Sequence, residues 1–160
     1  MLSLRKIDRQ NIWEIIKLEV NENQRGFVAT NTESLLEAYT VVTSGGAALP
    51  FGIYDGDIPV GFVMLGYDEL PGEDNPKIAK GNYSLWRFMI DKKYQGKGLG
   101  KQSMRLILEY IRSFPCGSAE YCFLSYEPEN IAAKKLYNSF GFSENGETDG
   151  DEIIAVLPLK

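Results

Sequence analysis

The feature that most constrains the fold is a glycine-rich segment between an apolar run and an amphipathic run. Residues 83–91, YSLWRFMID, are aromatic or apolar nearly throughout, a pattern typical of a buried central strand. Gly96, Gly98 and Gly100 alternate shortly afterwards, and a helix is predicted over about 98–114. The apolar face of that helix consists of Ile107, Tyr110, Ile111 and Phe114. A strand, a tight turn and a helix in succession indicate an α/β fold built around this segment.

The glycine turn has the properties of an anion-binding site. Glycines let a ligand approach the backbone closely, and the first N–H groups of a helix have no partner within the helix. The helix dipole is positive at this end, and Lys97 and Lys101 add positive charge beside it. The turn can therefore bind phosphate. A plain tight turn with a packed glycine explains the same residues.

Two nucleotide-binding patterns fit this turn poorly. The dinucleotide pattern Gly-x-Gly-x-x-Gly needs its third glycine one residue later than Gly100. The P-loop needs a longer glycine loop that ends in Lys-Ser or Lys-Thr, whereas Lys101 is followed by Gln102. A nucleotide-binding protein that uses the turn in another way is still an alternative.

The remaining sequence predicts further strands and helices in one unit. Strands are expected at 2–7, 49–54, 58–67, 121–126 and 151–159. Helices are expected after Asn11, over 33–43 with Thr32 or Asn31 as the cap, and over 129–140. Asp55-Gly56-Asp57 predicts a hairpin turn, and 68–81 a polar loop. Because no repeat or linker interrupts the pattern, residues 1–160 are expected to form a single mixed α/β domain.

The composition excludes several kinds of site and partner. Histidine is absent, which rules out histidine triads, histidine metal sites and imidazole proton shuttles. The spacing of Cys116 and Cys122 fits no zinc motif, so we expect no metal and a reduced, cytoplasmic setting. No secretory signal or membrane-spanning run is evident, so no membrane partner is expected. The net charge of −5 disfavours nucleic acid as the main partner.

Charge is distributed unevenly along the chain. Residues 14–80 contain eleven acids and four bases, a net charge of −7. Residues 87–112 contain seven bases and two acids, a net charge of +5. One segment therefore suits a cation and the other an anion, although solvated faces of different sign explain the same pattern.

A second motif lies in the last predicted helix. Asn130, Ala133, Lys134 and Tyr137 are spaced so that they share one helix face, and Ala132, Leu136 and Phe140 form the core side. A polar amide and a phenol two turns apart can line a single groove. The alternative is that the Tyr137 ring only anchors the helix in the core.

Together, the two motifs resemble those of the GNAT N-acetyltransferase superfamily. Gln95, Gly98 and Gly100 match its pyrophosphate turn, Gln/Arg-x-x-Gly-x-Gly/Ala, in register. Residues 130–142 resemble its later signature, Asn-x-x-Ala-x-x-Leu-Tyr-x-x-x-Gly-Phe, at every specified position. The resemblance covers roughly 84–142. It implies a single-domain acyltransferase fold, with a mostly antiparallel twisted sheet of about six to seven strands splayed in the middle and about four flanking helices.

The resemblance also implies a donor and its contacts. Acetyl-CoA would give its acetyl group directly to a primary amine in a ternary complex. Backbone groups near Phe88, Met89 and Ile90 would bind the pantetheine arm, and one N–H would polarise the thioester carbonyl. The pyrophosphate would be held by Gln95, Gly96, Lys97, Gly98, Leu99, Gly100 and Lys101. Asn130 and Lys134 would contact the same cofactor.

Two residues are expected to carry the proton transfers. The general acid of the superfamily maps onto Tyr137, which would protonate the departing thiolate. The acceptor ammonium needs a base, and some polyamine acetyltransferases place a Glu where this chain has Trp86. Glu127, at the end of the preceding strand, is our substitute for that base. Its alternative role is that of a solvated turn residue.

The acceptor is expected to be a small amine that binds to the acidic N-terminal half. Glu22 and Glu37 would attract the cation, and Trp86 would cover its alkyl part. Further acids in this half are Glu19, Glu33, Asp68, Glu69, Glu73 and Asp74. The chain resembles bacterial spermine/spermidine acetyltransferases, so a polyamine is the first expectation, ahead of an aminoglycoside or a protein N-terminus. A non-catalytic acyl-CoA-binding module, and a homodimer formed through strand 153–159, are further possibilities.

Overall fold

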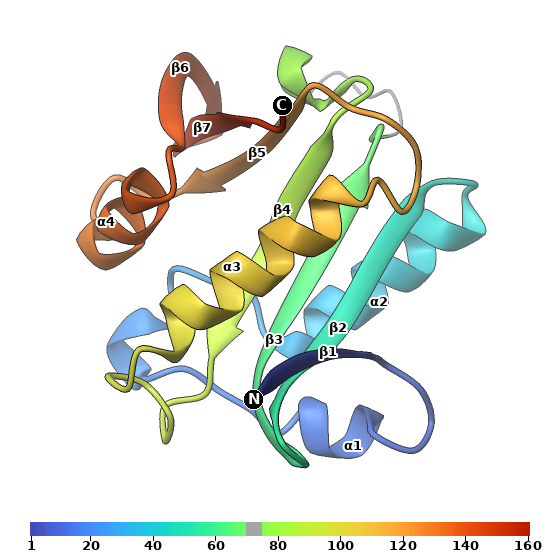
Figure 1. Ribbon diagram of the computed structural model, residues 1–160, viewed down its shortest axis with the longest axis vertical. Coiled ribbons are helices and arrows are strands. Elements are labelled where there is room, and N and C mark those ends of the chain that lie inside the picture. The colour runs from blue at the N-terminus through green and yellow to red at the C-terminus, as the bar shows by residue number, and fades with distance from the viewer. Residues whose placement is uncertain (70–74) are drawn as a thin grey trace.

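The computed structural model describes residues 1–69 and 75–160. Its strands form one sheet in the order β1-β2-β3-β4-β5-β7-β6 (Figure 1). The strands are β1 (Leu2–Lys6), β2 (Ala47–Asp55), β3 (Ile58–Tyr67), β4 (Tyr83–Ile90), β5 (Tyr121–Tyr126), β6 (Ser143–Asp149) and β7 (Glu152–Pro158). The helices are α1 (Ile12–Ile15), η1 (Glu22–Gln24), α2 (Asn31–Thr43), η2 (Lys77–Ala79), α3 (Leu99–Arg112) and α4 (Ile131–Ser139).

The sheet opens between its two central strands. All neighbouring strands pair antiparallel except β4 and β5, which run parallel and pair only at Tyr83 with Cys122 and Ser84 with Phe123. Beyond Ser84 the two strands diverge, as the gap between them in Figure 1 shows. The mixed α/β fold and the predicted splay of a mostly antiparallel sheet are therefore confirmed.

A bulge in β4 lies beside this opening. Arg87 pairs with Met64 of β3, whereas Leu85 pairs with the next residue, Leu65, so that Trp86 has no partner of its own. A β-bulge of this kind bends its strand and increases the local twist. The bend follows directly after the last residue that β4 pairs with β5, and it contributes to the separation of the two strands.

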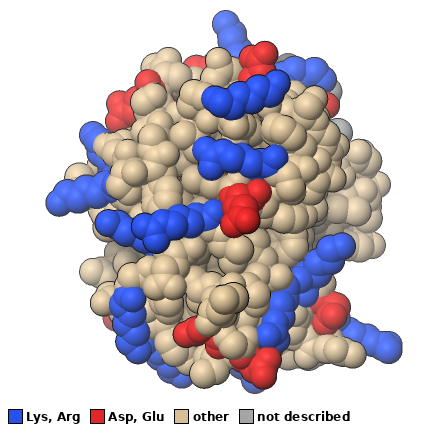
Figure 2. Space-filling model, in the orientation of Figure 1, with Lys and Arg blue, Asp and Glu red and all other residues tan. Residues whose placement is uncertain are grey.

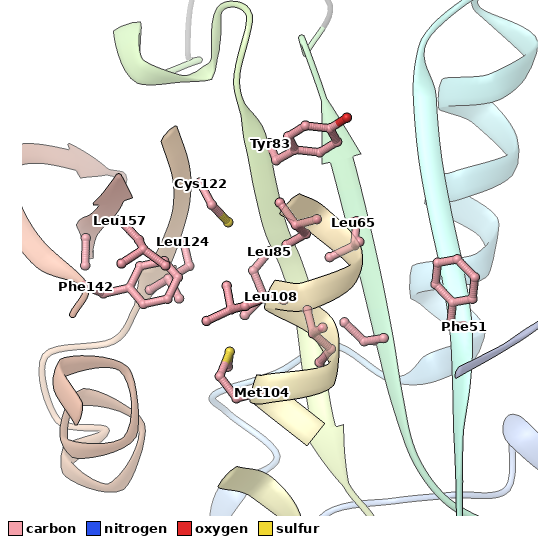
Figure 3. Close-up of a cluster of buried hydrophobic side chains, with 14 of the residues drawn as sticks. Phe51, Leu65, Tyr83, Leu85, Met104, Leu108, Cys122, Leu124, Phe142 and Leu157 are labelled. Atoms are coloured by element: carbon pink, nitrogen blue, oxygen red, sulfur yellow. The ribbon is translucent and has the colours of Figure 1, made fainter. Parts of the chain in front are cut away.

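The two faces of the sheet bury different helices. Helix α3 crosses one face, where Met104, Ile107 and Ile111 are fully buried (Figure 1). Leu85 of β4 and Leu108 of α3 lie in the same cluster, which continues to Leu124, Phe142 and Leu157 near β5 (Figure 3). On the opposite face, Ile15 and Ala38 pack with Phe62, Met64 and Met89. Successive residues of β3 thus serve both cores, as the alternation of side chains along a strand requires.

The structure corrects three local expectations. Thr30, not Thr32 or Asn31, caps α2, because the Thr30 side chain accepts the Glu33 N–H at 3.1 Å. The Asn31 amide is buried and donates to the Ile15 backbone oxygen. Strand β6 was not expected. Strand β7 has β5 on one edge and β6 on the other, so neither edge is available to pair with a second chain.

Candidate active site

The gap between β4 and β5 contains a pocket of about 890 Å³. Its walls come from β4, β5, the start of α3, α4 and the segment 24–29 that precedes α2. It is lined by most of the predicted site residues, namely Trp86, Phe88, Met89, Ile90, Gln95, Gly96, Gly98, Leu99, Gly100, Asn130 and Tyr137. The structure therefore brings the two sequence motifs, which lie thirty residues apart in the chain, to one cavity.

The start of α3 presents free backbone amides to this pocket. Gly98 is the N-cap, with a φ of 78° that glycine adopts without strain, and no side chain caps the helix. A Cβ built on Gly100 would have its nearest neighbour, a Leu136 methyl group, at 4.0 Å, so the backbone is open to a ligand there. Lys and Arg side chains gather over α3 on this face of the molecule (Figure 2). These features together fit a phosphate-bearing ligand.

The Gln95 side chain is engaged in hydrogen bonds within the protein. Its amide nitrogen donates to the Ile90 backbone oxygen and to Gln24 Oε1, both at 2.9 Å. Its oxygen accepts from the Asn21 amide at 3.1 Å. Gln95 thus joins the end of β4 and the glycine turn to the η1 segment.

Helix α4 supplies the amide and the phenol that its spacing predicted. The Asn130 side chain accepts the Ala133 N–H at 3.2 Å and so caps the helix. Tyr137 is half-buried, with its ring centroid 6.0 Å from those of both Tyr126 and Phe142. Burial raises the pKa of the Tyr137 phenol, and the nearby charge of Glu152 raises it further. The phenol is therefore protonated throughout the physiological pH range.

Six predicted site residues lie outside the lining of the pocket, and two of them form ion pairs. The Lys134 ammonium pairs with Glu144 at 3.6 Å, and the Glu37 carboxylate pairs with Arg87 at 3.1 Å. Glu127, Glu22, Lys97 and Lys101 are also absent from the lining. Glu73 and Asp74 fall outside the described residues.

Three carboxylates line the pocket, and of these only Glu69 was among the acids expected to attract the amine. Glu69 follows β3, Asp149 ends β6 and Glu152 begins β7, and all three line the cavity. Burial and the charge of Asp149 raise the pKa of Glu69, an effect that the Ser84 hydroxyl partly offsets. Asp149 and Glu152 are cross-strand partners in the β6–β7 hairpin. Because β6 is polar and was not foreseen, no sequence signal placed these acids together.

Residues 27–142 match the family model for the acetyltransferase (GNAT) family. This match spans both motifs and the opening between β4 and β5. The chain belongs to this family. It is an N-acetyltransferase, and the resemblance inferred from its two motifs is confirmed.

One characterised relative of this acetyltransferase is the spermine/spermidine N(1)-acetyltransferase of Bacillus subtilis strain 168. The two are 33% identical over 150 residues, which cover 92% of this chain and 91% of the relative. The fold is similar to that of a spermidine N-acetyltransferase from Vibrio cholerae in complex with CoA and spermine, with a TM-score of 0.70, 22% identity and coverage of 99% and 95%. It is also similar to aminoglycoside acetyltransferase AAC(6')-Ib in complex with coenzyme A, with a TM-score of 0.77, 17% identity and the same coverage.

Within 1–69 and 75–160, no helix has the length and apolar character needed to cross a membrane. In the same ranges, no three His, Cys, Asp or Glu side chains are grouped so that they could hold a metal ion.

Proposed function

We propose that this acetyltransferase transfers the acetyl group of acetyl-CoA to a primary amine of a polyamine such as spermidine or spermine. The observation that carries the proposal is the single pocket, which joins an anion-binding helix start to a set of carboxylates. One end suits a diphosphate and the other suits an alkyl ammonium. The relative from Bacillus subtilis, matched over nearly its full length, supports the same acceptor class.

The donor would lie along the unpaired edge of β4. Past Ser84 this edge has no strand beside it, so backbone groups near Phe88, Met89 and Ile90 would bind the amides of a pantetheine arm, apart from the Ile90 oxygen that accepts from Gln95. The amides at the start of α3 would bind the diphosphate, and Asn130 would contact the arm from α4. Bound acetyl-CoA would supply the thioester. A β4 N–H directed at its carbonyl oxygen would stabilise the negative charge that develops there.

The reaction requires two proton movements. The acceptor amine loses a proton and forms a bond to the acetyl carbon, the carbon–sulfur bond breaks, and the CoA sulfur gains a proton. Tyr137 is the phenol on the pocket wall formed by α4, and its raised pKa keeps it protonated and able to donate a hydrogen bond to the developing thiolate. The products are an N-acetylated amine and CoA with a free thiol.

The acceptor side of the pocket favours a cation with several charges. Glu69, Asp149 and Glu152 line it, and Trp86 adds an aromatic surface. Glu37, which we expected to bind the substrate, neutralises Arg87 instead. Pocket carboxylates therefore outnumber unpaired cations on this side, and a polyamine of spaced ammonium groups matches them.

The test is a thiol-release assay with acetyl-CoA over a panel of amines: spermine, spermidine, putrescine, an aminoglycoside, and a peptide with a free N-terminus. We expect the highest kcat/KM with spermine or spermidine, together with CoA release in equal amount to acetylated amine. An aminoglycoside with higher kcat/KM would make the enzyme an aminoglycoside acetyltransferase, as the likeness of fold allows. Acetyl-CoA binding without thiol release from any amine would indicate a non-catalytic module.

Two variants that each remove one negative charge test where the amine binds in the pocket. Asp149→Asn removes a pocket carboxylate, and we expect it to raise KM for spermine more than KM for the monoamine propylamine. Asp151→Asn, an exposed residue in the turn of the same hairpin that does not line the pocket, is the control. Equal effects of the two variants on KM for spermine would contradict the proposed position of the acceptor.

A further inference from the structure

We propose that Glu152 is the carboxylate that takes the proton from the acceptor ammonium, and that Ser125 positions it for this step. The inference rests on the proposed acetyl transfer to an amine. It assigns to Glu152 the role of base, for which the sequence analysis had named Glu127. Four observations carry it: the place of Glu152 in the pocket, its single hydrogen bond, its proximity to Tyr137, and the engagement of the neighbouring acids.

Glu152 is held in the pocket by strand pairing and by one side chain. It is the first residue of β7, where it lines the cavity together with Ser125 of β5. The Ser125 hydroxyl donates to Glu152 Oε2 at 2.7 Å. Among the described residues, no other side chain or backbone group donates to this carboxylate. Oε1 is therefore free to accept a proton from a substrate or from a water molecule bound to it.

Glu152 lies close to the proposed general acid. Its negative charge is the second cause, after burial, of the raised pKa of Tyr137 on α4. Figure 1 shows α4 next to the β6–β7 hairpin, and the ion pair between Lys134 and Glu144 joins these two elements. Both residues line the same pocket, and an acyl transfer between an ammonium and a thioester needs a base and an acid at one site.

The other acids near Tyr137 are less suited to the role. Glu144 accepts from the Tyr126 hydroxyl at 3.0 Å, pairs with Lys134 and does not line the pocket. Glu127 does not line the pocket. Asp149 faces Glu152 across the hairpin and also interacts with Glu69, which places it toward the acceptor end of the cavity. The charged or titratable groups facing Glu152 are thus Asp149 from β6, Tyr137 from α4 and, beyond Asp149, Glu69.

The proton balance of the step is simple. The ammonium nitrogen loses two protons in all. Glu152 accepts the first and returns it to solvent through the mouth of the pocket, and the freed amine forms the bond to the acetyl carbon. As the carbon–sulfur bond breaks, the sulfur takes a proton from Tyr137, and the second proton lost from the nitrogen restores the Tyr137 phenol. An alkyl ammonium has a pKa of about 10.4, so only about one molecule in 2,500 is a free amine at pH 7, which is why a base matters.

The decisive experiment compares Glu152→Gln with the native enzyme for amines of different basicity. With spermidine at pH 7 we expect kcat to fall by about 100-fold. Trifluoroethylamine is largely unprotonated at pH 7 and needs no base, so the ratio of native to variant kcat/KM should approach one. The spermidine defect should also shrink as the pH rises toward the pKa of the amine. Equal defects with both amines, or a change in KM alone, would overturn the assignment.

Further variants separate positioning from folding. Ser125→Ala removes the hydrogen bond that orients the Glu152 carboxylate. We therefore expect kcat with spermidine to fall while kcat/KM with trifluoroethylamine stays near the native value, and Ser125→Thr should restore the rate with spermidine. Exposed Glu129→Gln is the control for loss of one negative charge near α4. Equal losses with both amines in Ser125→Ala, or no loss with spermidine, would contradict the positioning role.

A measurement without substrate tests the geometry directly. In the free protein, Glu152→Gln removes a negative charge near the Tyr137 ring. The carbon NMR signal of the labelled Tyr137 ring should therefore shift at pH 7, with Tyr137→Phe identifying the signal. An unchanged signal would contradict the proximity of the two residues. If the native enzyme acetylates no amine at all, the proposed function fails; if native and Glu152→Gln enzymes acetylate spermidine equally, only this assignment fails.

Discussion

The side-chain amide of Gln95 lies 2.9 Å from Gln24 Oε1, and this hydrogen bond joins the glycine turn to a segment 71 residues earlier in the chain. Both residues line the pocket, Gln95 on the side that suits the diphosphate and Gln24 beside the segment that leads to α2. The same amide also holds the Ile90 backbone oxygen at the end of β4. Gln95 therefore fixes the position of one wall of the pocket relative to another.

Replacement of Gln95 by Ala should weaken the binding of the amine as well as the binding of acetyl-CoA. We expect KM to rise for the amine as well as for acetyl-CoA, and the free energy of unfolding to fall by about 1–2 kcal/mol because three hydrogen bonds are lost. Steady-state kinetics and urea unfolding measure these effects. The control is Gln102→Ala on the exposed side of α3. An increase confined to KM for acetyl-CoA would indicate that Gln95 contacts only the cofactor.

The two neighbouring phenols of the pocket should differ in their effect on turnover. Tyr137→Phe removes the proposed acid, and we expect kcat to fall by about 100-fold while the acetyl-CoA Kd, measured by titration calorimetry, stays unchanged. Tyr126→Phe is the matched control, because its ring centroid is 6.0 Å away and its hydroxyl is engaged with Glu144. A similar loss of kcat in both variants would indicate a general disturbance of the pocket rather than acid catalysis.

Two glycines of the turn should respond to alanine in opposite directions. Gly98 has a φ of 78°, so Gly98→Ala should lower the free energy of unfolding by about 1–2 kcal/mol. Gly100 lies within α3 with space for a Cβ, so Gly100→Ala should raise it by up to about 1 kcal/mol. Its methyl group would nevertheless occupy the pocket, and the acetyl-CoA Kd should increase. A more stable Gly100→Ala protein with native affinity would contradict the proposed diphosphate site.

Local sequence patterns predicted the central part of this fold, because its signals are strong. The strand 83–91, the glycine turn and the helix that follows all lie where the apolar pattern and the glycines placed them. The splay between β4 and β5 is what the family resemblance implied, whereas their parallel pairing was not predicted. Thr30 was missed as a cap because Asn31, an equally good capping residue, is used to bind the Ile15 backbone oxygen.

The acidic side of the site could not be predicted from sequence in the same way. Strand β6 has mostly polar, exposed residues and forms only because β7 offers it an edge, so it has no apolar alternation of its own. Because β6 was not predicted, the sequence analysis had no reason to place Asp149 near Glu152 and Glu69. The acids that sequence position favoured, Glu22 and Glu37, instead lie outside the pocket lining.

Alkaline pH should destabilise the protein through buried tyrosine and cysteine side chains. Burial raises the pKa of Tyr54 to about 12, helped by its hydrogen bond to Glu14, and burial raises the pKa of the Cys122 thiol to about 12. The unfolded chain then loses these protons first, near pH 9 for the thiol and pH 10 for the phenol. The free energy of unfolding should consequently fall as the pH rises from about 9 to about 12.

Tyr54→Phe tests the phenol's share of this alkaline destabilisation. The variant loses the 2.6 Å hydrogen bond to Glu14, so it should be less stable than the native protein at pH 7, by about 1 kcal/mol. It has no phenol to titrate, so its unfolding free energy should decline less steeply above pH 10. Urea unfolding at several pH values measures both effects, with Tyr39→Phe on the exposed face of α2 as the control. If the Tyr54 phenol is responsible, the unfolding free energy of the native protein must approach that of the variant as the pH rises. Parallel pH profiles of the unfolding free energy would show that another group dominates.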